Sequence, residues 1–295
     1  MLSDGPLIVA HRGSSFLLAE HTLAAYEMAL AEGADGLECD VRLTRDGHLV
    51  CVHDRRLERT SNGRGAVSDR SLQDLHALDF GGWKVDLPSS ADDLVADGQN
   101  FGYLQPVIDD DKIRDAKRRV LTFDRLLELF CDYRRNAGRP VQLYVETKHP
   151  TRWGGLVEQR VIASLRRFGL VPNGPEPSVA DSTVVVMSFS PMAVRRLREL
   201  APAIPAVMLF DGLPRLYREG TLPFGATIAG PGVHVLRSRP RFAERIHAAG
   251  NQMYVWTVDE PDDIDFVMDL GADMIATNRP TRLLRHLDRS RERSY

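Results

Sequence analysis

The chain has 295 residues, enough for one large α/β domain or two smaller ones, and its 43% hydrophobic and 27% charged residues are ordinary for a globular protein. A formal net charge of −3 excludes a general electrostatic attraction to nucleic acid or to an anionic membrane. It has no apolar run near the roughly 18 residues that span a bilayer, no signal-like N-terminus and only three widely spaced cysteines, so we expect a cytoplasmic protein without a disulfide framework, a zinc motif or stable membrane insertion.

The first predicted strand is Leu7–Ala10, and its carboxyl end leads into His11-Arg12-Gly13. Thr22–Glu32 is predicted to be a helix, because its apolar residues recur at spacings that form one face. His21 stands just before this helix, where we expect it to cap the helix or to line the rim of a site rather than to act in catalysis.

Two carboxylates, Glu38 and Asp40, lie one residue apart in the apolar run Leu37–Val41. Residues i and i+2 of a strand point to the same face, so this spacing directs both carboxylates to one place. Such a pair is common on exposed sheet faces. Two adjacent carboxylates also repel each other unless a cation lies between them, and a divalent cation is the usual one.

The dipeptide Asp46-Gly47 is the strongest short signal for a β-hairpin. A loop made of these two residues would pair Asp40 with His53, whereas a loop of Arg45-Asp46 would pair Glu38 with His53. Either register predicts an imidazole beside the carboxylates. The connection is too short for a parallel crossover, which needs about a dozen residues, so we expect an antiparallel hairpin within a repeating β-α pattern.

Further along the chain, short apolar runs alternate with helical patterns. The predicted strands are Val141–Glu146, Val184–Ser188, Ala206–Leu209, Ala226–Ala229, Met253–Val258 and Met274–Ala276. The predicted helices include Leu156–Phe168, Met192–Leu200, Arg241–Ala249 and Asp262–Leu270. With the first two strands this gives eight parallel strands, so we predict a TIM (β/α)8 barrel with an extra hairpin near the N-terminus. An open doubly wound sheet is the alternative, but no Gly-x-Gly-x-x-Gly turn follows the first strand.

Two segments depart from this rhythm. Asp86–Lys117 is polar and rich in turn residues, and Asp109–Asp111 within it is expected to be solvated rather than a calcium site, because no spaced ligand pattern follows. The basic tail, Arg282–Tyr295, is expected to be a frayed surface helix.

Several motifs together resemble the glycerophosphodiester phosphodiesterase family, in particular a bacterial, actinobacterial-like member. They lie in order along nearly the whole chain: His11-Arg12-Gly13, Glu20-His21-Thr22, Gly33–Val41, Asp46-Gly47-His48, Val52-His53-Asp54, Glu58–Gly65, Val145–Lys148, Met187-Ser188-Phe189, Val255–Val258 and Gly271–Asn278. The family usually has Pro-Glu-Asn-Thr where this chain has Ala19 and His21 around Glu20. The resemblance implies one TIM-barrel phosphodiesterase domain over 1–295, with a small insertion, about 60–118, after the first β-α unit and over the mouth of the site.

The resemblance assigns the proton transfers of phosphodiester cleavage to His11 and His53, whose side chains ordinarily titrate near neutrality. Glu38, Asp40 and Glu146 would supply oxygen ligands, which favour Mg²⁺ or Ca²⁺ over zinc. The residues expected to bind the phosphate or the rest of the substrate are Arg12, Lys148, Trp256, Ser188 and Phe189, with His149 and Trp153 near the leaving group.

The activity implied by the resemblance is metal-dependent hydrolysis of small glycerophosphodiesters to sn-glycerol 3-phosphate and an alcohol. The family chemistry also allows a glycerol hydroxyl to attack first, giving a cyclic phosphate that water opens. One alternative is lysophospholipase D-type or glycerophosphoinositol phosphodiesterase activity, which an apolar groove in the insertion would favour. Another is a non-catalytic binding barrel, which should lack a histidine or a carboxylate that this chain retains.

Overall fold

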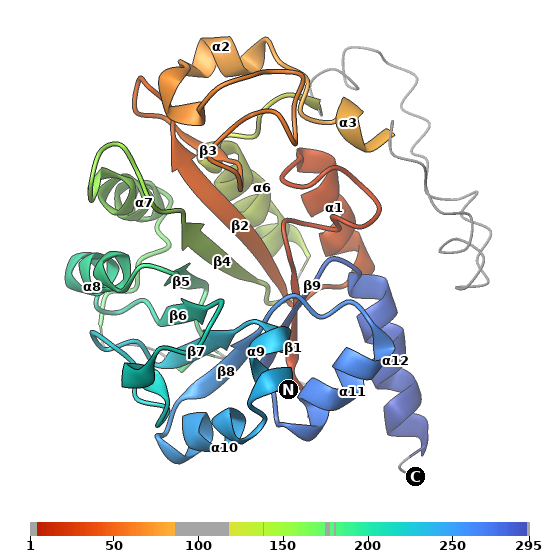
Figure 1. Cartoon of the computed structure of the whole chain (residues 1–295). Coiled ribbons are helices and arrows are strands. Elements are labelled where there is room, and N and C mark those ends of the chain that lie inside the picture. Colours follow the sequence, from red (N-terminus) through yellow and green to blue (C-terminus); the bar gives the residue numbers. More distant parts are fainter. Residues whose placement is uncertain (1–4, 86–117, 138, 175–177, 180, 294–295) are drawn as a thin grey trace.

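A computed structural model describes residues 5–85, 118–137, 139–174, 178–179 and 181–293, and within them eight parallel strands close into a barrel (Figure 1). The barrel strands are β1 (Leu7–Ala10), β2 (Gly36–Leu43), β4 (Gln142–Thr147), β5 (Val184–Ser188), β6 (Ala206–Phe210), β7 (Ile228–Pro231), β8 (Gln252–Val255) and β9 (Met274–Thr277). β1 pairs with both β2 and β9, which closes the ring, and β3 (Leu49–Cys51) extends β2 as an antiparallel partner. The predicted TIM barrel is confirmed.

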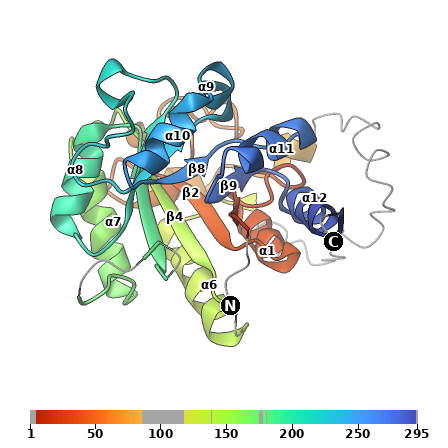
Figure 2. The ribbon, with the colours of Figure 1, turned by 90° about the horizontal axis from the view of Figure 1, so that it is seen from below.

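Helices surround the strands, as the view in Figure 2 shows. They are α1 (Leu23–Glu32), α6 (Phe123–Asn136), α7 (Leu156–Arg167), α8 (Pro191–Leu200), α9 (Val233–Ser238), α10 (Arg241–Ala248), α11 (Pro261–Asp269) and α12 (Pro280–Arg293). The hydroxyl of Thr22 caps α1 by accepting a hydrogen bond from the backbone N–H of Ala25, and Gly33 ends this helix in the left-handed conformation.

The tail is more than a frayed surface helix. In α12, Leu283 is fully buried and Leu287 is nearly so, and both belong to the same apolar core as the outward faces of the strands. The first part of this helix therefore completes the barrel wall beside β1 and α1.

Two apolar layers hold the barrel together. Residues at alternate strand positions fill its interior: Val9, Tyr144, Val185, Val207, Ile228, Tyr254 and Met274. The rings of Tyr144 and Tyr254 stack with their centroids 5.5 Å apart. The intervening residues point outward and pack against the helices. Since side chains fill the interior of the barrel, a ligand can bind only at one end of it.

The hairpin between β2 and β3 has neither of the two predicted registers. Its loop has three residues, Arg45–Gly47, with Gly47 at φ +82°, and Asp40 therefore faces Val52. A glycine in the left-handed conformation is typical of three-residue hairpin loops, where it adds one residue to the turn. His53 consequently lies beyond the ladder, in the segment that leaves β3.

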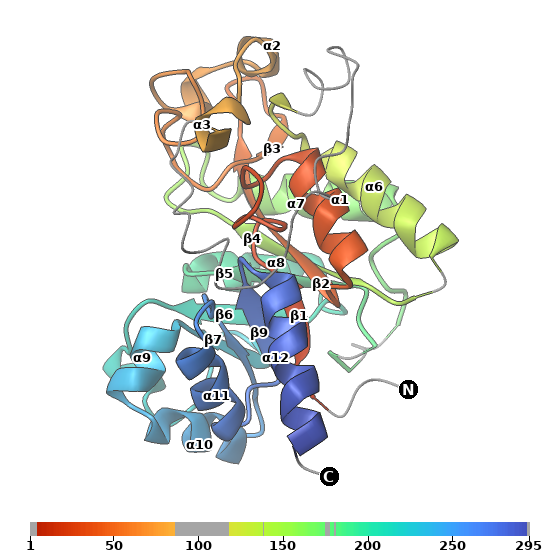
Figure 3. The same cartoon turned by 90° about the vertical axis from the view of Figure 1, so that its right-hand side faces the viewer.

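The described part of the predicted insertion follows β3. It contains a 3₁₀ turn η1 (Val67–Asp69) and the helices α2 (Leu72–His76) and α3 (Gly82–Val85). Figure 3 shows α2 and α3 at the end of the molecule opposite α10. The predictions made for Asp86–Lys117, including the Asp109–Asp111 run, fall outside the described residues. None of the helices in the described ranges is long and apolar enough to cross a membrane.

Candidate active site

The carboxyl ends of the barrel strands surround a cavity of about 240 Å³. Eight of the ten predicted site residues line this cavity: His11, Arg12, Glu38, His53, Glu146, Lys148, Phe189 and Trp256. They come from widely separated parts of the chain, and the parallel arrangement of the strands brings them to one edge.

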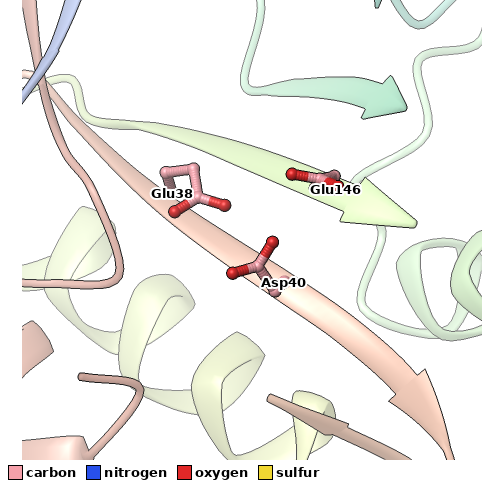
Figure 4. A group of neighbouring side chains, drawn as sticks. All are labelled: Glu38, Asp40 and Glu146. Atoms are coloured by element: carbon pink, nitrogen blue, oxygen red, sulfur yellow. The ribbon is translucent and has the colours of Figure 1, made fainter. Parts of the chain in front are cut away.

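Glu38, Asp40 and Glu146 form a compact cluster of carboxylates at this end of the barrel. β2 contributes the first two and β4 the third, with Asp40 directly opposite Glu146 in the register of the two strands. One oxygen from each carboxylate lies within 4.8 Å of the others, and all three side chains are buried and converge (Figure 4). This confirms that the one-residue spacing directs Glu38 and Asp40 to the same place.

The cluster has too little positive charge around it. Burial and the charge of Asp40 raise the pKa of Glu146 to about 8, and the same two causes raise the pKa of Glu38 well above its usual range. Burial also opposes ionisation of Asp40, but Lys148 and Arg12 hold the pKa of this carboxyl well below its usual range.

The contacts explain the difference between the three carboxylates. The ammonium of Lys148 lies 3.3 Å from Oδ1 of Asp40 and 2.7 Å from Oε1 of Glu146, and Nε of Arg12 lies 3.2 Å from Oδ2 of Asp40. Glu38 accepts a hydrogen bond of 2.9 Å from the backbone N–H of Arg12. Its other oxygen, Oε1, is buried and has no hydrogen-bond partner among the described residues.

These features fit a divalent cation. A buried carboxylate oxygen without a partner and two carboxyls with raised pKa values are features that a bound divalent cation would satisfy. The donor atoms are all carboxylate oxygens, a set that suits Mg²⁺ or Ca²⁺. Glu38, Asp40 and Glu146 are therefore the residues that could hold such an ion.

The prediction that His21 caps the helix or lines the rim of the site is wrong. Thr22 caps α1, and the imidazole of His21 is buried. Its Nε2 donates to Oδ2 of Asp40 across 2.8 Å, and its Nδ1 is 2.8 Å from the hydroxyl of Tyr26. That hydroxyl donates to the backbone carbonyl of Glu38. His21 thus links two members of the carboxylate cluster through a buried hydrogen-bond network.

His11 is oriented by Asn278, which follows β9. The amide nitrogen of Asn278 donates to Asp259 across 2.6 Å, so its Oδ1 faces His11 and accepts from Nδ1–H across 2.8 Å. This leaves Nε2 of His11 as the nitrogen with a free lone pair. Burial and the neighbouring Arg12 lower the pKa of His11 to about 3, so the imidazole is neutral at pH 7.

His53 has a carboxylate as its partner instead of an amide. Its Nδ1 lies 2.6 Å from Asp54, which is in turn bonded to the guanidinium of Arg59 at 2.7 Å. Burial lowers the pKa of His53 to about 4, with a further contribution from Arg12. Arg59 also pairs with Glu20 across 2.7 Å, which ties the His53 segment to the loop before α1.

Two aromatic residues form one wall of the cavity. Phe189 and Trp256 meet edge to face with their centroids 5.3 Å apart, and the ammonium of Lys148 lies 5.5 Å from the centroid of the Phe189 ring. The indole N–H of Trp256 donates to the carbonyl of Gly230, which fixes the ring.

Of the two predicted site residues that do not line the cavity, Asp40 belongs to the carboxylate cluster and Ser188 lies elsewhere, as does His149, which was expected near the leaving group. Ser188 is fully buried outside the cavity, where its hydroxyl donates to the carbonyl of Thr147 and accepts from the N–H of Ser190, so it joins β4 to β5. His149 turns away toward α7 and bonds to Glu158 across 2.6 Å.

The sequence analysis did not identify the partners that orient the histidines. Asp54, Arg59 and Asn278 lie inside the motifs quoted above, and Asp259 lies one residue beyond one of them, but nothing in the local pattern gave any of them a role. The only sequence signal for these four residues was their position, just after β3 or near the carboxyl ends of β8 and β9, where the site residues of a barrel are expected.

Comparison with known proteins is consistent with this geometry. Residues 11–282 match the model of the glycerophosphoryl diester phosphodiesterase family. The chain is 44% identical to a probable glycerophosphodiester phosphodiesterase 1 of Mycobacterium tuberculosis, over 96% of this chain and 92% of that protein. It is 30% identical to a glycerophosphodiester phosphodiesterase of Bacillus subtilis, over 94% and 85%. An Oleispira antarctica phosphodiesterase, solved with the product sn-glycerol-3-phosphate, has the same fold, with a TM-score of 0.73, 21% identity and coverage of 96% and 97%.

Proposed function

Because the chain belongs to the glycerophosphodiester phosphodiesterase family and is thus a phosphoric diester hydrolase, we propose that it cleaves small glycerophosphodiesters to sn-glycerol 3-phosphate and an alcohol. The observation that carries this proposal is the sharing of one cavity by two neutral imidazoles and the buried carboxylate cluster. The product bound by the Oleispira antarctica neighbour supports the choice of substrate.

In this proposal Glu38, Asp40 and Glu146 hold one divalent cation, Mg²⁺ or Ca²⁺. When bound, such a cation neutralises the charge of the phosphate and acts as a Lewis acid. Arg12 and Lys148 bind the same phosphate, the first through a planar fork of donors and the second as a point charge. Phe189 and Trp256 form an apolar wall for the carbon atoms of the substrate.

The surroundings of the two histidines suggest how they divide the proton transfers. His11 is paired with a neutral amide and is itself neutral. Its Nε2 is therefore suited to act as a base, which accepts a proton from the attacking group, a glycerol hydroxyl or water. His53 is paired with the carboxylate of Asp54, which stabilises an imidazolium. His53 is neutral in the free protein, and the negative charge of a bound phosphodiester would favour its protonated form. We therefore assign the acid that protonates the departing alkoxide to His53.

The proposed reaction is tested by measuring release of glycerol 3-phosphate from glycerophosphocholine. The wild-type protein is assayed with EDTA and after addition of Mg²⁺ or Ca²⁺, beside His11→Ala. We expect EDTA to remove the activity of the wild-type protein and an added metal to restore it. His11→Ala should be roughly 10²- to 10⁴-fold less active than the wild type. Turnover that survives both EDTA and His11→Ala would contradict the mechanism. Failure with every metal would favour a lysolipid or glycerophosphoinositol substrate.

The assignment of acid and base is tested with a substrate whose leaving group departs without being protonated. The p-nitrophenyl ester of glycerol 3-phosphate releases a stable phenolate. If His53 is the acid, His53→Ala should recover most of its lost activity on this ester, whereas His11→Ala should not. The opposite pattern would exchange the two roles.

A further inference from the structure

A second cleft, of about 350 Å³, adjoins the catalytic cavity. Lys148 lines both the cavity and the cleft, so the two meet at a residue that we propose binds the substrate phosphate. The walls of the cleft come from the end of β2, from the segment between β3 and η1, from η1 itself and from the loop after β4, and they include Arg42, Arg55 and Arg152.

The cleft is strongly cationic. Three arginines and Lys148 line it, against a single carboxylate, Asp69, which is already paired with Arg152 at 2.9 Å. The guanidinium of Arg152 lies 4.9 Å from the centroid of the Trp153 ring, which limits its movement.

Arg42 and Arg55 have donors to spare. The Nε of Arg42 donates to the carbonyl of His53 across 2.9 Å, and its terminal nitrogens make no hydrogen bond with the residues that the structure describes. The guanidinium of Arg55 makes no hydrogen bond or ion pair with any residue that the structure describes, although its backbone carbonyl accepts from the N–H of Val67. Both side chains line the same cleft. Two guanidinium groups with free donors on the wall of one cleft are suited to binding an anion.

We propose that this cleft binds a second negatively charged group, a phosphate or a carboxylate, carried by the alcohol half of the diester. The inference rests on the proposed function and specifies its substrate class. The phosphate to be cleaved contacts Lys148 on the cavity side, and the alcohol extends past Lys148 toward Arg42 and Arg55. The volume suits a small molecule.

The same residues disfavour an acyl chain in this cleft. Covering Arg42 and Arg55 with hydrocarbon would remove water from charged groups without replacing its hydrogen bonds, which is unfavourable. An anion replaces them directly. Leu43, Val67 and Trp153 also line the cleft, but at Arg42 and Arg55 it favours a charged, water-soluble alcohol over the tail of a lysolipid.

The test uses two substrates that differ by one charged group: glycerophosphoglycerol, and the same diester with a phosphate on its terminal hydroxyl. We expect the metal-loaded wild-type enzyme to have the higher kcat/KM for the phosphorylated diester, by about tenfold at low salt, and less in 0.5 M NaCl because ions screen a partly exposed site. Arg55→Gln should reduce this preference about fivefold and leave kcat/KM for glycerophosphoglycerol close to that of the wild type. Arg55→Lys should restore part of it.

Arg56→Gln is the matched control. Arg56 is the next residue, is also exposed, pairs with Glu58 across 2.6 Å and does not line the cleft. Its loss should leave the preference unchanged. A wild-type enzyme that shows no preference, or an equal effect of Arg55→Gln and Arg56→Gln, would overturn the inference.

A binding measurement separates this inference from the proposed reaction. Calorimetry with the His11→Ala variant and the phosphorylated diester needs no turnover. Binding that is about fivefold weaker after adding Arg55→Gln supports the anion site even if no diester is cleaved. Equal binding with and without Arg55→Gln overturns it even if the reaction is confirmed.

Discussion

At the scale of single residues, the site is organised by an imbalance of charge. Three buried carboxylates share the positive charges of Arg12 and Lys148, and only Asp40 is well neutralised by them. Glu38 and Glu146 respond with raised pKa values. The carboxylate cluster is therefore prepared to exchange protons for a cation.

This exchange predicts a dependence of metal affinity on pH. Glu146 has a pKa of about 8 without metal and so carries a proton at pH 7, which a cation must displace. The affinity for Mg²⁺ should rise from pH 6 to pH 8, by up to tenfold per unit for the proton of Glu146, with a further contribution from Glu38, whose pKa is also raised. Calorimetry in buffers of different ionisation enthalpy measures the released proton. Glu32→Gln is the control, because Glu32 is bonded to Thr281 and lies outside the cluster. An affinity that does not change between pH 6 and pH 8 would refute this linkage.

His21 should act as a positioning residue for Asp40. His21→Ala removes the 2.8 Å hydrogen bond to Oδ2 and leaves that oxygen held by Arg12 alone, so we expect metal affinity and kcat to fall roughly 10- to 100-fold. His21→Asn, which restores the residue usual in the family, should recover part of the loss because its amide can donate to the same oxygen. If His21→Ala lowers the melting temperature but leaves the Kd for Mg²⁺ unchanged, the role of His21 is structural only.

At the scale of elements, the corner between β1 and α1 is the most constrained part of the site. Arg12 and His21 both have left-handed backbones, with φ of +59° and +58°, and the N–H of His21 donates to the carbonyl of Arg12. A non-glycine residue in this conformation costs about 1 kcal/mol or more. The corner places Arg12 against Asp40 and His21 beneath it, so the strain is located where the predicted ligands are held.

Gly13 is predicted to be essential to this corner. Its φ is +81°, and a Cβ there would come within 2.7 Å of the backbone of Ala25 in α1. Gly13→Ala should lower the free energy of unfolding by about 2–3 kcal/mol and reduce activity by displacing Arg12. Gly47→Ala is the matched control, because Gly47 has φ +82° but its Cβ would meet nothing closer than 3.8 Å. That variant should lose only about 1 kcal/mol. Equal losses in chemical denaturation would mean that packing against α1 is unimportant.

At the scale of the whole molecule, a filled barrel interior separates stability from catalysis. The interior layer that includes Val9, Val207 and Ile228 is apolar and buried, whereas the charged groups gather at the mouth. Because β1 closes the ring against both β2 and β9, no strand of the barrel can separate without breaking two ladders. We therefore propose that the chain is one folding domain.

One cooperative unfolding transition is the expected consequence. Ile228→Ala, inside the barrel, should lower the free energy of unfolding by about 3 kcal/mol without splitting the transition. Leu216→Ala, at a side chain 78% exposed, should change it by less than about 0.5 kcal/mol. Far-UV circular dichroism and tryptophan fluorescence, recorded during thermal unfolding, should give the same midpoint. Two separate midpoints would show that the barrel does not unfold as one unit.

The sequence by itself determined the features that depend on local spacing. The alternation of apolar runs and helical patterns predicted the eight-stranded barrel, and two of the later strands, Ala226–Ala229 and Met253–Val258, were misplaced by two to three residues at an end. The one-residue spacing of Glu38 and Asp40 predicted their shared face. The motifs pointed to the family. Each of these follows from side-chain periodicity or from residue type.

Only the tertiary structure decided the features that depend on contacts between distant segments. The hairpin register changed because Gly47 takes a left-handed φ in a three-residue loop, and a register is fixed by turn geometry together with burial. His21 and Asn278 gained their roles because chain closure brings them against Asp40 and His11. Ser188 lost its predicted role because its hydroxyl is already bonded between β4 and β5. Hydrogen-bond partners far apart in the chain leave no periodic signal, since they are chosen by how the strands meet in space.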